Sequence, residues 1–271
     1  MSSSLLFSLS ALIAMLPATA YGLLARQNET RAASFWAALA VALAGTLTWT
    51  WTQFSNGWHT GFAASLWLTI SATLLLFAGL AVVAPPARKL GVLLLPYLSI
   101  LGLIALLWER APERALGAPL SPWAMTHIGV SILAYAFATL AAVAAVGVIW
   151  RERALKSKTD RASVSPVGLP AVAEGERLQT RLLVAAAIML AAGIATGMAT
   201  QIVEFGAWLP LNHKVILALV AFAIVLILLL LHMRFGLTGR RAARVLLSAY
   251  LLLSLAYPGV KFVTDVLIGA H

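Results

Sequence analysis

Histidines are the side chains of this chain with the clearest potential for chemistry. The sequence contains five histidines and no cysteine, which excludes a disulfide framework and a thiolate metal site. His127 lies near the start of the apolar run 125–150, and His213 begins the run 213–232. Imidazole nitrogens are common axial ligands of haem iron, and helix bundles hold cofactors between facing helices. His127 and His213 are therefore candidate axial ligands of one haem iron, with haem b as the expected cofactor.

Polar side chains near these two histidines could complete such a site. Ser131 and Tyr135 follow His127 at four and eight residues, which places all three on the same side of a helix. Cations pair with carboxylates such as the haem propionates through charge-assisted hydrogen bonds. The candidate cations are those expected on the same side of the membrane as His127, namely Lys214, Lys261, Arg110 and Arg114. Each of them could instead contact lipid phosphates.

Two other metal chemistries compete with a single haem. A zinc site built from histidine and carboxylate would need acidic ligands. Glu204 and Asp265 lie near the expected outer ends of helices, and such ligands are scarce. A relay of two stacked haems would need four ligands, and His213 and His232 share one helix about 28 Å apart at 1.5 Å per residue. Because His232 has no histidine partner at its own depth, a two-haem relay is disfavoured.

The composition requires a membrane environment. Of the 271 residues, 62% are hydrophobic and 10% are charged, whereas a soluble domain carries about 25% charged residues. A helix needs roughly 20 apolar residues to cross the hydrocarbon of a bilayer. We therefore predict an all-α, polytopic integral membrane bundle of about eight transmembrane helices, at residues 4–25, 33–52, 60–84, 90–108, 123–150, 181–203, 213–233 and 245–268.

The positive charges predict the orientation of this bundle. Fifteen of the 19 basic residues lie in the loops after the first, third, fifth and seventh segments. The positive-inside rule makes these loops cytoplasmic and places both termini outside. The net charge of +10 is then explained by cytoplasmic loops, so the lipid bilayer is the expected partner and nucleic acid is not. His232 lies at the inner side, and the outer side holds His59, His127, His213 and His271.

The chain reads as one transmembrane domain over residues 1–271, with a mobile cytoplasmic linker at 154–178 that is poor in large apolar groups. Residues 18–20 imitate a signal-peptide cleavage site, but the missing basic n-region favours a retained first helix.

No Walker loop, dinucleotide fingerprint, HExxH motif or nucleophile elbow occurs. We therefore assign no catalytic residue and do not expect an enzyme. Gly193 and Gly197 form a GxxxG pair, which predicts close helix packing.

In their order along the chain, these features resemble the cytochrome c assembly family of the CcmC and CcsA type. Within that family the chain is similar to the shorter YpjD-like branch of the inner membrane. The match covers about the last 150 residues, with a core at 120–268, and is looser over the first four segments. The residues that carry it are 127–135, 168–170, 176–177, 193–197, 213–214, 232–241 and 256–262.

The resemblance implies a haem-handling protein of cytochrome c biogenesis in the bacterial inner membrane. It implies a haem chaperone, with other cytochrome c maturation proteins as partners. His127 matches an outer haem-ligating histidine of the family, and His232 matches a histidine near the cytoplasmic end of its helix. His213 as the second ligand is our inference from topology. Haem-delivering members carry a WxWD segment where this chain has Trp208 and no aspartate, so Trp208 is the remaining candidate aromatic contact.

Two other functions stay open. One is an accessory or regulatory inner-membrane protein with the same fold and without haem delivery, for which the long cytoplasmic segment offers a contact surface. The other is a small-molecule or ion transporter, which would have inverted repeats and interrupted helices around a midplane site. Pro17, Pro96 and Pro258 could interrupt helices, but no charged residue lies deep in an apolar segment.

Overall fold

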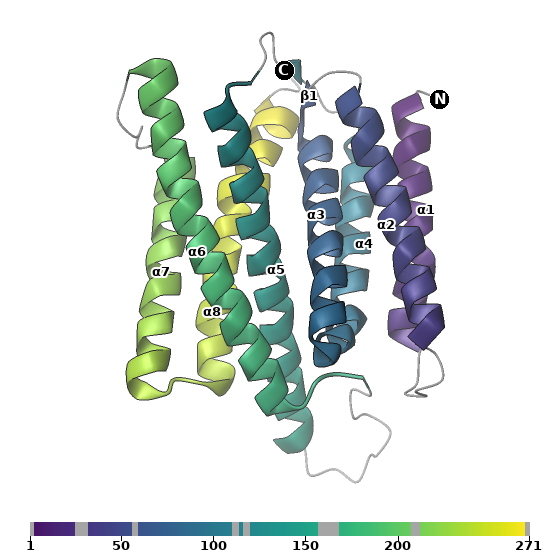
Figure 1. The fold of residues 1–271 in the computed structure, drawn as a ribbon, viewed down its shortest axis with the longest axis vertical. Coiled ribbons are helices and arrows are strands. Elements are labelled where there is room, and N and C mark those ends of the chain that lie inside the picture. Colours follow the sequence, from purple (N-terminus) through teal and green to yellow (C-terminus); the bar gives the residue numbers. More distant parts are fainter. Residues whose placement is uncertain are drawn as a thin grey trace. The chain divides into compact units, whose positions relative to one another are not determined.

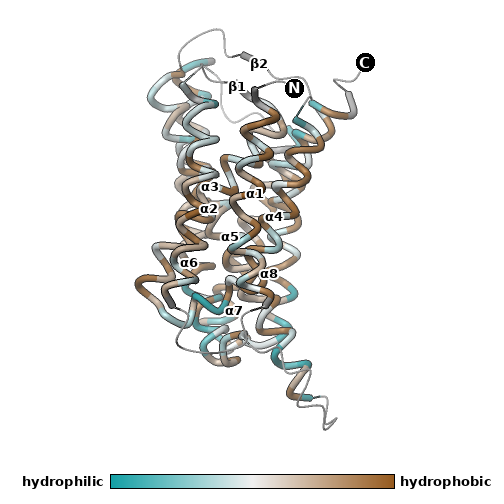
Figure 2. Tube along the Cα trace, turned by 90° about the vertical axis from the view of Figure 1, so that its right-hand side faces the viewer, coloured by the Kyte–Doolittle hydropathy of each residue, from teal (hydrophilic) through white to brown (hydrophobic). Residues whose placement is uncertain are grey.

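The computed structural model describes residues 3–24, 32–55, 59–109, 114–115, 120–156, 168–206 and 212–268. Within these residues, eight helices are long and apolar enough to cross a membrane (Figure 1). The prediction of an all-α membrane protein is therefore confirmed. Figure 2 shows that apolar residues extend along most of each helix, whereas hydrophilic colours gather toward the helix ends.

The helices follow the expected segments in order. They are α1 (Ser3–Leu24), α2 (Ala32–Ser55), α3 (Phe62–Val83), α4 (Gly91–Leu107), α5 (Pro122–Lys156), α6 (Val172–Phe205), α7 (His213–Phe235) and α8 (Gly239–Ser254). The shorter elements are the 3₁₀ helix η2 (Pro85–Leu90), the π-helical turns η3 (Leu255–Gly259) and η4 (Phe262–Ile268), and the two-residue strands β1 (His59–Thr60) and β2 (Arg114–Ala115), which pair antiparallel.

Three helices extend beyond their apolar runs. The helix α5 continues to Lys156 and α6 already begins at Val172, so both ends of the linker expected at 154–178 are helical. Residues 157–167 lie outside the described residues. The helix α8 begins at Gly239, six residues before the expected 245. Charged residues such as Arg151 and Glu176 can continue a helix beyond the bilayer, and hydrophobicity alone does not detect these extensions.

The expected single domain packs as two compact units. Unit 1 comprises Met1–Ala115, Trp150–Ala171 and Lys261–His271, and unit 2 comprises Leu116–Ile149 and Val172–Val260. In unit 1, α1 packs against α2 and α4. The Trp49 indole nitrogen donates to the Ser8 hydroxyl at 2.7 Å, and Ser8 donates to the Glu109 carboxylate at 2.7 Å. The Trp49 ring also packs against Trp67 at 5.6 Å, so this tryptophan belongs to the core of unit 1.

Lys261, one of the cations considered for the haem propionates, forms a hydrogen bond within unit 1. Lys261 Nζ donates to the carbonyl oxygen of Gly61 at 3.1 Å, just before α3 begins. Close to this bond, Phe62, Trp108 and Phe262 form a cluster of edge-to-face rings with centroids 5.4–6.5 Å apart. Lys261 therefore ties the end of the chain to unit 1.

Unit 2 is built from α5 to α8 and the turn η3. Ser121 precedes α5 and its hydroxyl accepts from the amide of Ala124 at 3.1 Å, as an N-cap followed by proline at the first helical position should. Asn212 caps α7 in the same way through the amide of Val215. At the other end of α7, Gly236 adopts φ +60°, the left-handed conformation that ends many helices. These caps fix where the helices of unit 2 begin and end.

Candidate functional site

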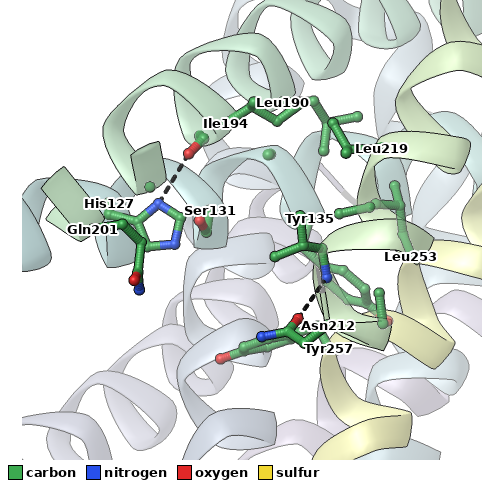
Figure 3. A pocket seen from close by; sticks show the side chains of 16 residues that line it. His127, Ser131, Tyr135, Leu190, Ile194, Gln201, Asn212, Leu219, Leu253 and Tyr257 are labelled. Carbon is green, nitrogen blue, oxygen red and sulfur yellow. Dashed lines mark hydrogen bonds between the residues drawn. The ribbon is translucent and has the colours of Figure 1, made fainter. Parts of the chain in front are cut away.

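A cavity lies in unit 2, between α5, α6, α7 and the junction of α8 with η3. Its volume is about 340 Å³, and it is open on one side. Most of its wall is apolar, with residues such as Leu190, Leu219 and Leu253. Its polar side chains come from four separate elements and are His127, Ser131, Tyr135, Gln201, Asn212 and Tyr257 (Figure 3).

The end of the cavity near His127 is held by a contact between α5 and α6. The hydroxyl of Ser121, which caps α5, donates to the carboxylate of Glu204 in the last turn of α6. Ser121 therefore closes the first turn of α5 and also joins it to α6. His127 lies less than two turns further along α5, so this contact joins the two helices close to the residue.

The half-buried imidazole of His127 is oriented by the backbone of α6. Its Nδ1 lies 3.0 Å from the carbonyl oxygen of Gly193 (Figure 3) and 3.4 Å from the hydroxyl of Thr196. The Thr196 hydroxyl already donates to the carbonyl of Ala192 at 2.7 Å. Because a carbonyl oxygen can only accept, Nδ1 must carry the proton in the bond to Gly193. In the neutral ring, Nε2 is then the acceptor.

The second nitrogen of the His127 ring is available for a ligand. None of the described residues gives Nε2 a hydrogen-bond partner, and His127 lines the cavity. Histidines that bind metals almost always donate their other ring N–H to a carbonyl, a carboxylate or water, which fixes the tautomer and the orientation of the ring. The bond between His127 and Gly193 has this form.

Tyrosines and a π-helical turn form the inner wall of the cavity. The hydroxyl of Tyr135 lies 3.0 Å from that of Ser254, and Tyr250 donates to Tyr135 at 3.4 Å. Pro258 has no amide hydrogen and cannot continue an α-helix regularly. The chain passes it in the π-helical turn η3, and two successive residues of this turn, Ala256 and Tyr257, both line the cavity.

Comparison with known proteins identifies the family. The sequence model described as "Cytochrome C assembly protein" matches residues 28–268, which is most of the chain. The chain belongs to this family. Membership supports a haem-related role in cytochrome c biogenesis, as the resemblance of the sequence implies.

Curated relatives cover the chain to different extents. An uncharacterized 28.8 kDa protein of Azospirillum brasilense is 46% identical over 274 residues, which is 99% of this chain and all of the relative. The inner membrane protein YpjD of Escherichia coli K12 is 27% identical over 183 residues, 67% of this chain and 68% of YpjD. No solved structure matches the chain. The inner-membrane relative and the eight apolar helices together support a membrane protein.

The structure brings together only part of the predicted site. His127, Ser131 and Tyr135, which their spacing placed on one side of a helix, all line one cavity. His213 is exposed and is not among the residues that line the cavity, although its neighbours Asn212 and Val215 are. His232 lies at the opposite end of α7, where its Nδ1 is 3.0 Å from the carbonyl of Leu237. Trp208 lies outside the described residues, and the side chain of Lys214 is not described.

Sequence reasoning missed three polar residues of the cavity. Gln201, Asn212 and Tyr257 come from α6, from the cap of α7 and from η3. The signal for Asn212 was present, since an asparagine before a long apolar run is a typical helix cap. No group of three or more histidine, cysteine, aspartate or glutamate side chains that could hold a metal ion occurs in the described part of the chain. A haem iron needs fewer protein ligands than a zinc ion in a structural site.

Proposed function

We propose that this protein binds haem in the cavity of unit 2, with Nε2 of His127 as an axial ligand of the iron. In this proposal it acts in the bacterial inner membrane as a haem chaperone of cytochrome c assembly. The observation that carries the proposal is the bond from His127 Nδ1 to the Gly193 carbonyl, at 3.0 Å. In the neutral ring this bond directs the Nδ1–H group toward α6 and leaves Nε2, the acceptor nitrogen, for a ligand in the cavity.

The shape and chemistry of the cavity fit a flat, amphipathic ligand. A volume of about 340 Å³ lies at the lower end of the range for ligand pockets, about 300–1,000 Å³. Because the cavity is also open on one side, part of the macrocycle would lie outside it. The apolar wall at Leu190, Leu219 and Leu253 suits the porphyrin, and the amides of Gln201 and Asn212 offer hydrogen bonds to its propionates.

The residues that line the cavity favour carriage over catalysis. Haem supplies a redox-active iron when bound, and His127 provides it with a neutral nitrogen ligand. We assign no bond-making role to any side chain of the cavity. Ser131 and Tyr135 contribute to the wall, and Tyr135 is held in place by the hydroxyl of Ser254.

The second axial position has two candidates. His213 is our candidate from the chain itself, and because its side chain is exposed it would have to turn toward the cavity. The alternative is water or another small ligand from solution. A bis-histidine site gives sharp, separate α and β bands when the iron is reduced. We therefore expect the loss of these sharp bands in His213→Ala if His213 is the second ligand.

The proposal is tested by titrating the full-length, detergent-purified protein with haemin and recording visible spectra before and after reduction. The wild type should develop a saturable Soret band, and His127→Ala should not. The matched control is His232→Ala, because His232 lies at the opposite end of α7 and contacts the Leu237 carbonyl. This variant should bind haemin like the wild type.

Two results would contradict the proposal. One is a saturable Soret band of equal affinity in His127→Ala and wild type. The other is a wild-type protein that is folded and does not bind haemin at any concentration tested. The second result would favour an accessory or regulatory role without haem, and co-purification of a partner with the full chain would then be the next measurement.

A further inference from the structure

The two glycines of the GxxxG pair in α6 have different surroundings. A Cβ atom added at Gly193 would lie 3.6 Å from the hydroxyl oxygen of Ser131 and 4.0 Å from Val130, which are ordinary contacts. A Cβ atom added at Gly197 would lie 2.9 Å from Cε1, 3.2 Å from Nδ1 and 3.5 Å from Nε2 of His127. The imidazole therefore lies directly over Gly197, in space that any other residue type would occupy.

We infer that Gly197 is a positioning residue for His127, and that with the Gly193 carbonyl it selects the tautomer of the ring. This inference rests on the proposed function, because the selected tautomer is the one that leaves Nε2 free for iron. The GxxxG pair was expected to serve close packing between helices. Both glycines face α5, but an added Cβ would make only ordinary contacts at Gly193, whereas at Gly197 it would meet the imidazole.

The imidazole of His127 is the part of the site that can move when a methyl group is added at Gly197. A Cβ at 2.9 Å from a ring carbon is closer than real contacts allow, so either the ring or the helix must shift. The backbone of α6 is held by its own hydrogen bonds, whereas the imidazole can rotate about two side-chain bonds. The ring would therefore move, and the bond from Nδ1 to the Gly193 carbonyl at 3.0 Å would lengthen or break. The proton would then be free to occupy either nitrogen.

Thr196 does not replace this control. Its hydroxyl approaches Nδ1 at 3.4 Å, but it lies 2.7 Å from the Ala192 carbonyl and 3.1 Å from the Gly193 carbonyl, to which it can donate. A hydroxyl can both donate and accept, so it tolerates either tautomer of the imidazole. A carbonyl accepts only. The selection therefore comes from the Gly193 backbone, with Gly197 holding the ring against it.

Matched glycine substitutions separate positioning from packing. Gly197→Ala places a methyl group 2.9 Å from the ring, and Gly175→Ala places one equally close, 2.9 Å, to Val148 Cγ2 near the start of the same helix, away from the cavity. Both substitutions raise the helix propensity of α6 in the same way. A difference between the two variants therefore reports on the imidazole.

The experiment measures the ring nitrogens directly, without haem. The full chain is labelled with ¹⁵N-histidine, purified in detergent, and studied by NMR at alkaline pH, where imidazole is neutral. The His127 signals are assigned by their loss in His127→Ala. We expect one tautomer, protonated at Nδ1, in the wild type and in Gly175→Ala. In Gly197→Ala we expect both tautomers to be populated. Haemin affinity should fall about 10- to 100-fold in Gly197→Ala and stay unchanged in Gly175→Ala.

The outcomes separate this inference from the proposed function. A wild-type His127 protonated at Nε2 overturns the inference without the need for any variant, even if Gly197→Ala fails to fold. An unchanged tautomer together with unchanged haemin affinity in folded Gly197→Ala also overturns it. Mixed tautomers in Gly197→Ala with no haemin binding by the wild type would support the positioning role and would contradict the proposed function.

Discussion

The Nδ1 atom of His127 lies 3.0 Å from the carbonyl oxygen of Gly193, so a histidine at the head of one helix is oriented by the backbone of the next. The contact needs no charged partner, and this suits a site within an apolar bundle, where ionised groups are expensive. It also joins α5 to α6 at the cavity. Substitutions that disturb this junction should therefore change both the packing of unit 2 and the geometry of the proposed haem site.

The cap of α5 should contribute measurably to stability. Ser121→Ala removes the acceptor for the Ala124 amide and the donor to Glu204. Loss of an N-cap costs about 0.5–2 kcal/mol, so the unfolding temperature in detergent should fall. Glu204→Gln is the control, because an amide oxygen still accepts from Ser121. An unfolding temperature of Ser121→Ala equal to that of the wild type would show that α5 does not depend on this cap.

The hydroxyl of Tyr135 should stabilise the wall of the cavity. Tyr135→Phe removes its hydrogen bond with Ser254 at 3.0 Å in a side chain that is only 7% exposed. An internal hydrogen bond of this kind contributes about 1 kcal/mol, so thermal unfolding in detergent should occur at a lower temperature. The control is Ser248→Ala, which removes an exposed hydroxyl from α8, the helix that also carries Ser254. This variant should leave stability within about 0.5 kcal/mol of the wild type. Equal unfolding temperatures for both variants would contradict this role.

The start of α8 should depend on Glu176. Its carboxylate accepts from the amide of Gly239 at 2.7 Å and joins the first residues of α6 to those of α8. Glu176→Ala leaves this amide without its partner and should cost about 1–3 kcal/mol, because the acceptor is charged. Glu176→Gln keeps an acceptor oxygen and should retain part of the stability. Hydrogen exchange at residues 239–242 measures the effect locally, and unchanged protection in Glu176→Ala would contradict the prediction.

Unit 1 offers a test that the proposed site belongs to unit 2. Ser8 is fully buried and lies between the Trp49 indole and the Glu109 carboxylate. Ser8→Ala leaves the buried indole N–H without its partner, which should destabilise the protein by about 1–3 kcal/mol. Haemin affinity of the folded variant should equal that of the wild type. A large loss of haemin binding in the folded variant would indicate that unit 1 contributes to the site.

Most of the helices and half of the site could be predicted from the sequence. Hydrophobic runs of spanning length locate α1 to α8 because the bilayer requires them. The spacing of His127, Ser131 and Tyr135 also sufficed, because the three residues share one helix and its period fixes their common side.

The rest of the site depends on relationships between elements. His213 lies only one residue beyond Asn212, and both are exposed, yet Asn212 lines the cavity and His213 does not. The role of Gly197 has no sequence signal of its own, since a glycine that supports a ring and a glycine that packs a helix look alike. Tyr257 reaches the cavity through a π-helical turn, and helical periodicity does not predict that turn.

The most direct test of haem ligation by His127 is a ligand-replacement experiment. His127→Gly removes the imidazole and leaves a space of its shape, which free imidazole can fill. The purified variant is titrated with haemin, first alone and then with imidazole, and the reduced spectra are compared with the wild type. The proposal predicts weak binding by the variant alone and recovery of the wild-type spectrum with imidazole. A wild-type spectrum and affinity in His127→Gly without imidazole would contradict the assignment of His127 as the haem ligand.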